Sequence, residues 1–191
     1  NADFAASWMV GDSTADLLAA HTAGVRSILL ETGAAGLDEK YAVLPDFIAP
    51  NLPVAVDFIL HHYPRLLQRC ETLAQEISPG EMLFIGGPSR TGKSTLTRCM
   101  QDALLQQDKS SIILSLDGWL RAPQERGLNV LERYDISTLL NLIQNLVGRT
   151  QAQVLTVPIY SKTNKQKQRV LQKQIAPKDI VILEGTIALH L

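Results

Sequence analysis

The stretch that decides the fold is a glycine-rich loop, Gly87-Pro88-Ser89-Arg90-Thr91-Gly92-Lys93-Ser94-Thr95. The apolar run at 82–86 before it predicts a buried strand, and residues 96–105 after it follow helical spacing. Strand, glycine loop, Lys-Ser and helix, in this order, are typical of a phosphate-binding loop. The glycines let several backbone N–H groups point at one anion, and the helix N-terminus adds partial positive charge. The pattern predicts that the whole loop binds a nucleotide, with Lys93 on the terminal phosphates and the Ser94 hydroxyl on Mg²⁺.

Composition limits the classes of protein that the chain can belong to. Its 191 residues suffice for one large domain or two small ones, and 46% of them are apolar. A net charge of −1 argues against a nucleic-acid partner held by bulk electrostatics. Cys70 and Cys99 fall in apolar helical patterns, so we expect buried free thiols, which suit the cytoplasm. The sequence contains no signal peptide and no membrane-length apolar run.

The basic residues are concentrated in one stretch without acids, which contains Lys162, Lys165, Lys167, Arg169 and Lys173. We expect this stretch to form a solvated helix or flap. The alternative is a mobile edge that meets phosphate groups.

The N-terminal part predicts the tail of an open parallel α/β sheet, with strands at 7–10, 25–30 and 46–49. Asp12 follows the first strand, and Asp16 lies in the first turn of a helix over 15–23, with Gly24 after it. Two carboxylates near one point suit Mg²⁺. The alternative is a helix cap and a solvated acid.

Residues 7–60 resemble the haloacid dehalogenase-like phosphatases, most of all the heptose-bisphosphate and histidinol-phosphate phosphatase branch. The matching pieces are Trp8-Met9-Val10-Gly11-Asp12-Ser13, Asp16, Leu29-Leu30-Glu31-Thr32-Gly33, Pro45-Asp46-Phe47-Ile48 and Leu52-Pro53-Val54-Ala55-Val56. The resemblance implies that Asp12 holds Mg²⁺ with support from Asp16. The family's nucleophile, acid/base and phosphate-binding lysine lie upstream of this motif. We therefore expect the 191 residues to be a fragment that does not hydrolyse phosphate esters.

A joint follows this part. Pro64 is expected to end one helix near His62 and to begin another that runs to Ile77, because proline cannot sit inside a continuous helix without kinking it. The sequence predicts a phosphatase-like part at 1–62, a linker helix at 63–80 and a second domain at 81–191.

The second domain repeats the pattern of strands that end on polar residues. A strand at 111–116 delivers Asp117, and a strand at 179–184 ends on Glu184. Ligands bind at the carboxyl ends of the strands in open α/β sheets. Asp117 is therefore a candidate general base, with an ordinary Asp-Gly turn as the alternative, and Glu184 could approach the Mg²⁺. Asp135 precedes a helix predicted at 136–147.

Residues 81–187 resemble the uridine kinase and phosphoribulokinase family of P-loop kinases. Besides the loop, the matching pieces are Leu116-Asp117-Gly118-Trp119-Leu120, Arg133-Tyr134-Asp135, Val157-Pro158-Ile159-Tyr160 and Val181-Ile182-Leu183-Glu184-Gly185. The resemblance implies ATP and Mg²⁺ at Lys93, Ser94 and Thr95. It also implies that Asp117 acts as base and Glu184 as the carboxylate on the metal side. It suggests that Asp135 and Tyr160 contact the acceptor.

The chain departs from this family in two places. Nucleoside kinases follow the tyrosine with an acid, a histidine and a basic residue, whereas this chain has Ser161, Lys165 and Lys167 at those spacings. Lysines there fit a phosphorylated or acidic acceptor better than a nucleoside. The family's arginine-bearing lid, which follows the Glu-Gly strand, is missing, so we expect a truncated kinase domain.

These observations predict an α/β protein in which a partial Rossmann-like phosphatase domain precedes a P-loop kinase parallel sheet with flanking helices. The expected activity is ATP-dependent phosphoryl transfer to a hydroxyl of a sugar-like or nucleoside-like small molecule. One alternative is a polynucleotide kinase/phosphatase-type end-processing enzyme. Another is a regulatory nucleotide-binding module without transferase activity.

Overall fold

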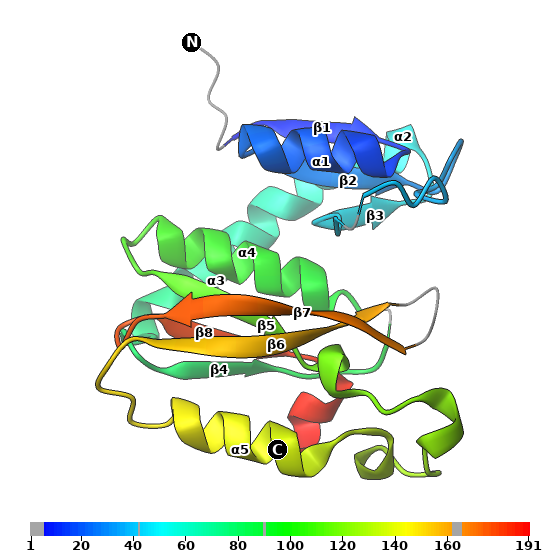
Figure 1. The fold of residues 1–191 in the computed structure, drawn as a ribbon. Helices are drawn as coiled ribbons and strands as arrows, with labels where there is room; N and C mark the ends of the chain where they lie inside the picture. Colours follow the sequence, from blue (N-terminus) through cyan, green and yellow to red (C-terminus); the bar gives the residue numbers. More distant parts are fainter. Residues whose placement is uncertain (1–5, 42, 90, 162–165) are drawn as a thin grey trace. The chain divides into compact units, whose positions relative to one another are not determined.

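The computed structural model describes residues 6–41, 43–89, 91–161 and 166–191. The chain divides into two compact units, Asn1–Arg69 and Cys70–Leu191. Each unit is built on its own parallel sheet (Figure 1). The division falls inside helix α3 (Tyr63–Glu76), so one helix contributes residues to both units.

The first unit has a three-stranded parallel sheet in the order β1-β2-β3, made of β1 (Trp8–Gly11), β2 (Arg26–Leu30) and β3 (Phe47–Ala49). Helix α1 (Thr14–Ala23) connects β1 to β2 and packs on both strands (Figure 1). Ser13 is its N-cap, and Gly24 ends it in the left-handed conformation. The predicted parallel α/β arrangement is confirmed for this part of the chain.

The helix that follows does not break where the sequence suggested. Helix α2 (Leu52–Asp57) passes through a π-helical turn, η1 (Phe58–His62), directly into α3. The Tyr63 N–H donates to the Phe58 carbonyl, five residues back, and Pro64 follows immediately. A π turn re-registers the hydrogen-bond ladder, so the residue without an N–H is accommodated. The expectation of two separate helices is therefore wrong.

The second unit has a parallel sheet in the order β4-β8-β5, made of β4 (Met82–Ile85), β8 (Ile180–Glu184) and β5 (Ser111–Ser115). The central strand β8 is buried along its whole length, which explains its continuous apolar sequence. Its register pairs Glu184 with both Ile85 and Ser115, so the three strands end at one level.

Two helices cover the sheet, α4 (Lys93–Leu105) and α5 (Ile136–Leu146), and Figure 1 shows them on opposite sides of it. On the α5 side, Val181 and Leu183 of β8 join one core cluster with Leu139 and Leu146. Cys70 and Cys99 are buried and free, as predicted. Short 3₁₀ turns lie in the connections, η2 (Leu116–Trp119), η3 (Pro123–Glu125) and η4 (Leu131–Arg133), and another, η5 (Thr186–His190), follows β8.

An antiparallel hairpin of β6 (Gln153–Ser161) and β7 (Gln166–Ile175) completes the second unit. Leu155, Val157 and Ile175 turn one face of it into the core cluster. From Gln166 onward the basic stretch forms a strand that pairs with β6, so the helix in the expectation of a solvated helix or flap is wrong. Lys162 and Lys165 lie outside the described residues.

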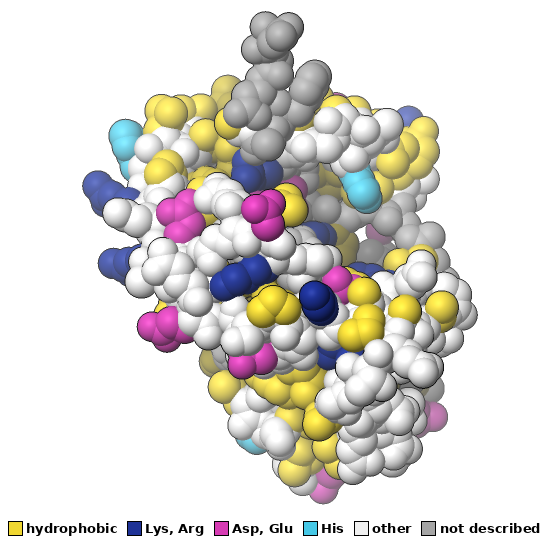
Figure 2. All heavy atoms as spheres, turned by 90° about the vertical axis from the view of Figure 1, so that its left-hand side faces the viewer, with side chains coloured by type: hydrophobic (Ala, Val, Ile, Leu, Met, Phe, Trp, Pro, Cys, Tyr) yellow, Lys and Arg dark blue, Asp and Glu magenta, His cyan; other side chains and the backbone are white. Residues whose placement is uncertain are grey.

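Within the described ranges, none of the helices is long and apolar enough to cross a membrane. On the face shown in Figure 2, basic and acidic side chains are interspersed.

Candidate functional site

The phosphate loop starts where β4 ends and stops where α4 begins. Gly87 and Gly92 have φ values of +153° and +83°, a backbone conformation that favours glycine. The Leu96 N–H donates to the Gly92 carbonyl at 2.9 Å, which is the first hydrogen bond of α4. The N–H groups of residues 93–95 precede this bond and project from the helix end, where they suit an anion. The geometry is therefore that of an anion cradle.

Two side chains of the loop form hydrogen bonds with the backbone of the loop itself. The Lys93 Nζ donates to the Pro88 carbonyl at 2.6 Å, and the Thr91 hydroxyl donates to the same oxygen at 2.8 Å. Pro88, Ser89 and Thr91 are exposed, so the loop is open to solvent. Arg90, which the sequence assigned to the nucleotide, lies outside the described residues.

Ser94 brings the loop to the end of the central strand. Its hydroxyl lies 3.4 Å from both carboxylate oxygens of Glu184. The Ser115 hydroxyl, at the end of β5, lies 3.4 Å from one of them. Sequence reasoning missed Ser115, although its position two residues before Asp117 places it at the same strand end.

The surroundings of Glu184 favour its neutral form. Glu184 is only 8% exposed. Its burial raises its pKa most, and the negative charge of Asp117 raises it further. The Lys93 charge and the two serine hydroxyls oppose this rise. Asp117 and Glu184 therefore lie close enough to repel each other at the ends of β5 and β8.

Asp117 also has a partner that the sequence did not indicate as a site residue. The hydroxyl of Tyr134, which is buried, donates to Asp117 Oδ1 at 3.5 Å. Burial and then the Asp117 charge raise the pKa of Tyr134 well above its usual range, so the phenol stays protonated and remains a donor.

The two residues expected at the acceptor have different environments. Asp135 is the N-cap of α5, and its carboxylate accepts from the Thr138 hydroxyl at 2.8 Å and the Thr138 N–H at 3.3 Å. The Tyr160 hydroxyl accepts from Arg126 Nη2 at 2.8 Å. Sequence reasoning missed Arg126, because the contact joins residues 34 positions apart. Roles of Asp135 and Tyr160 in acceptor binding remain predictions.

In the first unit, the two predicted magnesium ligands hold local structure. Asp12 Oδ2 accepts from the Ala34 N–H at 2.7 Å, which fixes the loop after β2. Asp16 forms a capping box with Ser13, whose hydroxyl donates to Asp16 Oδ2 at 2.7 Å. No group of three acidic, histidine or cysteine side chains suited to a metal is found among the described residues. The metal role of Asp12 and Asp16 remains a prediction.

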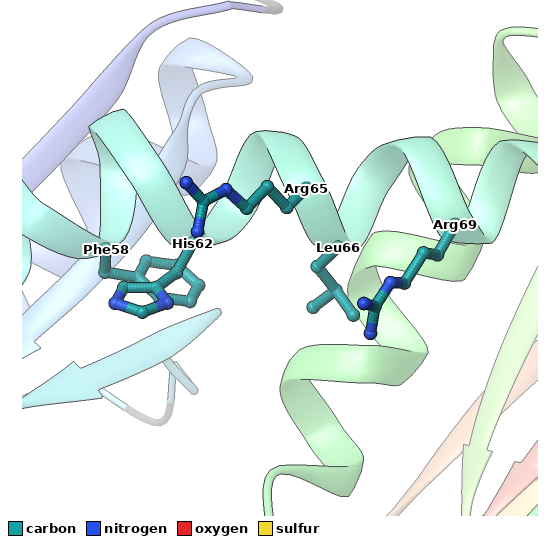
Figure 3. Close-up of a pocket in the computed structure, with 5 residues that line it drawn as sticks. All are labelled: Phe58, His62, Arg65, Leu66 and Arg69. Atoms are coloured by element: carbon teal, nitrogen blue, oxygen red, sulfur yellow. The ribbon is translucent and has the colours of Figure 1, made fainter.

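A hollow of about 370 Å³ lies beside the helix that runs from η1 into α3. Figure 3 shows the residues that line it, Phe58, His62, Arg65, Leu66 and Arg69. His62 Nε2 lies 2.9 Å from Asp57 Oδ2, and both side chains are largely exposed. None of these residues belongs to the predicted sites.

The residues of the second unit fit a magnesium nucleotide. The loop offers backbone N–H groups and Lys93 to phosphates, and the Ser94 hydroxyl and the Glu184 carboxylate supply oxygen ligands of the kind that Mg²⁺ prefers. The repulsion between the carboxylates of Asp117 and Glu184 would be relieved by a divalent cation.

The two parts of the chain are similar to different known proteins. A family model described as HAD-hydrolase-like matches residues 1–55. A candidate fructose transport system kinase from Silicibacter sp. TM1040 has a similar structure, with a TM-score of 0.52 and 17% identity over 63% of this chain and 62% of that one. A candidate uridine kinase from Bacillus stearothermophilus gives a TM-score of 0.51 and 20% identity over 66% of this chain and 72% of that one. No curated protein matches the sequence.

The chain thus spans less than two thirds of the first of these structures. At identities of 17% and 20%, the similarity to these two structures shows the fold of this chain alone. Both resemblances seen in the sequence are confirmed at this level, because a HAD-like part at residues 1–55 is joined to a uridine kinase-like P-loop kinase fold.

Proposed function

We propose that the chain belongs to an ATP-dependent kinase that transfers the γ-phosphoryl group to a hydroxyl of a small sugar-like or nucleoside-like metabolite. The observation that carries this proposal is the meeting of Ser94, Glu184 and Asp117 at one end of the sheet, beside the phosphate loop. Phosphoryl transfer needs a cradle for the phosphates, oxygen ligands for a metal and a base for the attacking hydroxyl. All three elements are supplied by parts of the chain that are distant in sequence.

In this mechanism each residue has one task. Lys93 and the N-terminal N–H groups of α4 bind the phosphates, while Ser94 and Glu184 would hold Mg²⁺, which supplies charge neutralisation. Asp117 accepts the proton of the acceptor hydroxyl. The acceptor oxygen forms a new bond to the γ-phosphorus, the bond to the β–γ bridging oxygen breaks, and ADP leaves.

The carboxylate of Asp117 is oriented for this task by Tyr134. Because the phenol stays protonated, it donates a hydrogen bond and keeps one oxygen of Asp117 occupied. We propose that the other oxygen accepts the proton of the acceptor hydroxyl. Tyr160 and Asp135 are proposed to contact the rest of the acceptor.

For the first unit, we propose that it derives from a phosphatase-like domain in which Asp12, with Asp16 beside it, holds Mg²⁺. The two activities would then be parts of one bifunctional cytoplasmic enzyme.

The test measures ATP binding by calorimetry in the presence of Mg²⁺, and transfer from [γ-³²P]ATP. Lys93→Ala removes a charge-assisted contact, so ATP should bind roughly 10- to 100-fold more weakly. The matched control is Lys178→Ala, an exposed lysine that precedes β8 at the opposite end of the sheet.

Unchanged ATP affinity in the Lys93→Ala protein would overturn the phosphate-loop assignment. ATP binding without transfer across a broad panel of hydroxyl compounds would favour a regulatory module. Tight binding of a single-stranded oligonucleotide would favour an end-processing enzyme.

A further inference from the structure

Ser115 ends strand β5 directly beside the residue that ends the central strand. The register of β5 and β8 makes Ser115 the Cα partner of Glu184. Leu114 and Leu183, which precede these two residues, belong to the core cluster on the α5 side of the sheet. Because successive side chains of a strand point to opposite faces, Ser115 and Glu184 face the α4 side together. Ser94, in the first turn of α4, contacts Glu184 there (Figure 1).

The backbone holds the two strand ends close together. A Cβ atom at Gly185, the residue after Glu184, would lie only 2.9 Å from the Cβ atom of Leu116. Leu116 follows Ser115 directly, so the two chains approach each other more closely than a larger residue would allow. The position of the Ser115 hydroxyl beside the Glu184 carboxylate is therefore set by the backbone of the sheet.

The hydroxyl of Ser115 takes part in one hydrogen bond. It lies 3.4 Å from one Glu184 carboxylate oxygen, and within the described part of the chain it has no other hydrogen-bond partner. The Ser94 hydroxyl, by contrast, lies near both carboxylate oxygens and is also the proposed ligand of Mg²⁺. A separation of 3.4 Å is long for a hydrogen bond between oxygens, and contacts of this kind in functional sites tighten when ligands bind.

We infer that Ser115 is a positioning residue, and that its hydroxyl holds the Glu184 carboxylate in place for the divalent cation. The inference rests on the proposed kinase function, because it concerns the metal side of that site. Carboxylates that bind metals are themselves hydrogen-bonded, and these supporting partners control metal affinity. In the proposed mechanism the oxygen of Ser94 binds the metal, so Ser115 is the donor that serves Glu184 alone.

The rival explanation is that the Ser115 hydroxyl only occupies a polar position at the end of β5. The two explanations differ in what they predict for the metal. A purely structural role affects nucleotide binding equally with and without Mg²⁺, or not at all. A positioning role affects the part of the nucleotide affinity that depends on Mg²⁺, and it acts only through Glu184.

The experiment measures the affinity for a non-hydrolysable ATP analogue by calorimetry, once with excess Mg²⁺ and once with EDTA. The ratio of the two affinities is the gain due to the metal. Ser115→Ala should reduce this gain roughly tenfold, at the lower end of what supporting partners of metal ligands contribute. The affinity in EDTA should stay unchanged. Ser115→Thr keeps the hydroxyl and should retain most of the gain.

Ser111→Ala is the matched control. Ser111 is partly buried like Ser115, lies at the opposite end of the same strand and pairs with Ile180, so the gain should stay unchanged. Glu184→Gln gives the loss expected when the carboxylate itself is missing. The double variant Ser115→Ala/Glu184→Gln should lose no more than Glu184→Gln alone, because two residues that act through one contact are not additive.

An undiminished gain in Ser115→Ala would overturn the inference, and so would losses that add in the double variant. A loss in Ser115→Thr as large as that in Ser115→Ala would also overturn it, since the hydroxyl is retained. Failure of the proposed function has a different result, in which the wild-type protein shows no gain from Mg²⁺ and Glu184→Gln changes nothing. A gain that depends on Glu184 and not on Ser115 would overturn this inference alone.

Discussion

The Ser94 hydroxyl lies 3.4 Å from both carboxylate oxygens of Glu184, although 90 residues separate them in the sequence. Ser94 is in the first turn of α4, and Glu184 ends the central strand of the sheet. The phosphate loop and the end of β8 therefore lie together and form one candidate site. Asp117, which raises the pKa of Glu184, extends this site to the neighbouring strand β5.

The first prediction concerns Glu184→Gln. Since the folded protein raises the pKa of Glu184, the unfolded chain loses this proton first as the pH rises, and stability falls through that window. Without nucleotide and Mg²⁺, the variant should therefore be more stable than wild type at pH 7.5, and the difference should shrink toward the ordinary glutamate pKa of about 4.3. Urea denaturation at several pH values measures this difference.

The same variant should lose function while it gains stability. Replacing a carboxylate on the metal side should lower Mg²⁺-dependent transfer roughly 10- to 100-fold. Glu125→Gln, at an exposed position, is the matched control and should change neither property. A Glu184→Gln protein with normal transfer and lower stability would contradict the assignment.

The second prediction concerns Gly118→Ala. A Cβ atom at this position would overlap the Pro158 carbonyl, so η2 and β6 could not approach as closely as they do. We expect a loss of about 1–3 kcal/mol in the free energy of unfolding. Asp117 is next to Gly118, and Tyr160 is close to Pro158 in the sequence. A shift of this contact should therefore also lower the rate of phosphoryl transfer.

Gly148→Ala provides the control for this prediction. Gly148 has a φ of +63°, and a Cβ there would meet no atom within 4 Å. This variant should cost about 1 kcal/mol through backbone strain alone, with transfer unchanged. Equal transfer by both variants would show that the close approach of Gly118 does not position the site.

The third prediction concerns the capping box of the first unit. Asp16→Ala removes the acceptor of the Ser13 N–H and hydroxyl, with donor–acceptor distances of 3.1 and 2.7 Å, and should destabilise α1 by about 0.5–2 kcal/mol. Hydrogen exchange of the α1 amides, read by mass spectrometry, should accelerate accordingly. Asp57→Ala, which removes an exposed pair with His62, should leave that exchange unchanged. Unaltered exchange in Asp16→Ala would contradict the capping role of Asp16.

The sequence predicted the parts of the molecule that are encoded locally. The glycine loop, the buried strands before Asp117 and Glu184, and the helix that begins after Asp135 each depend on a few adjacent residues. The parallel direction of the strands followed from their apolar runs and intervening helices, whereas their order in the sheet was not predicted. These features placed the candidate residues at the carboxyl ends of the strands, where the structure also has them.

What the sequence did not predict depends on contacts between distant segments. The strand β7 is polar and basic, and it is stabilised by pairing with β6, which no local pattern records. A π turn before Pro64 is one of several ways to accommodate a proline. The helix therefore continues past His62 and does not end there as expected. Arg126 falls in an irregular segment, and its contact with Tyr160 exists only because the loop closes at Tyr134.

The most direct test of the central claim is the rate of phosphoryl transfer in Asp117→Asn. In a single-turnover experiment with [γ-³²P]ATP and Mg²⁺, using D-glycerate or D-ribose 5-phosphate as acceptor, the account predicts unchanged ATP affinity and a rate lower by roughly 10²- to 10⁴-fold. Asp108→Asn is the control, because Asp108 lies beyond the far end of α4 at a left-handed position that asparagine tolerates. Transfer by Asp117→Asn at a rate close to that of wild type would contradict the claim that Asp117 is the base.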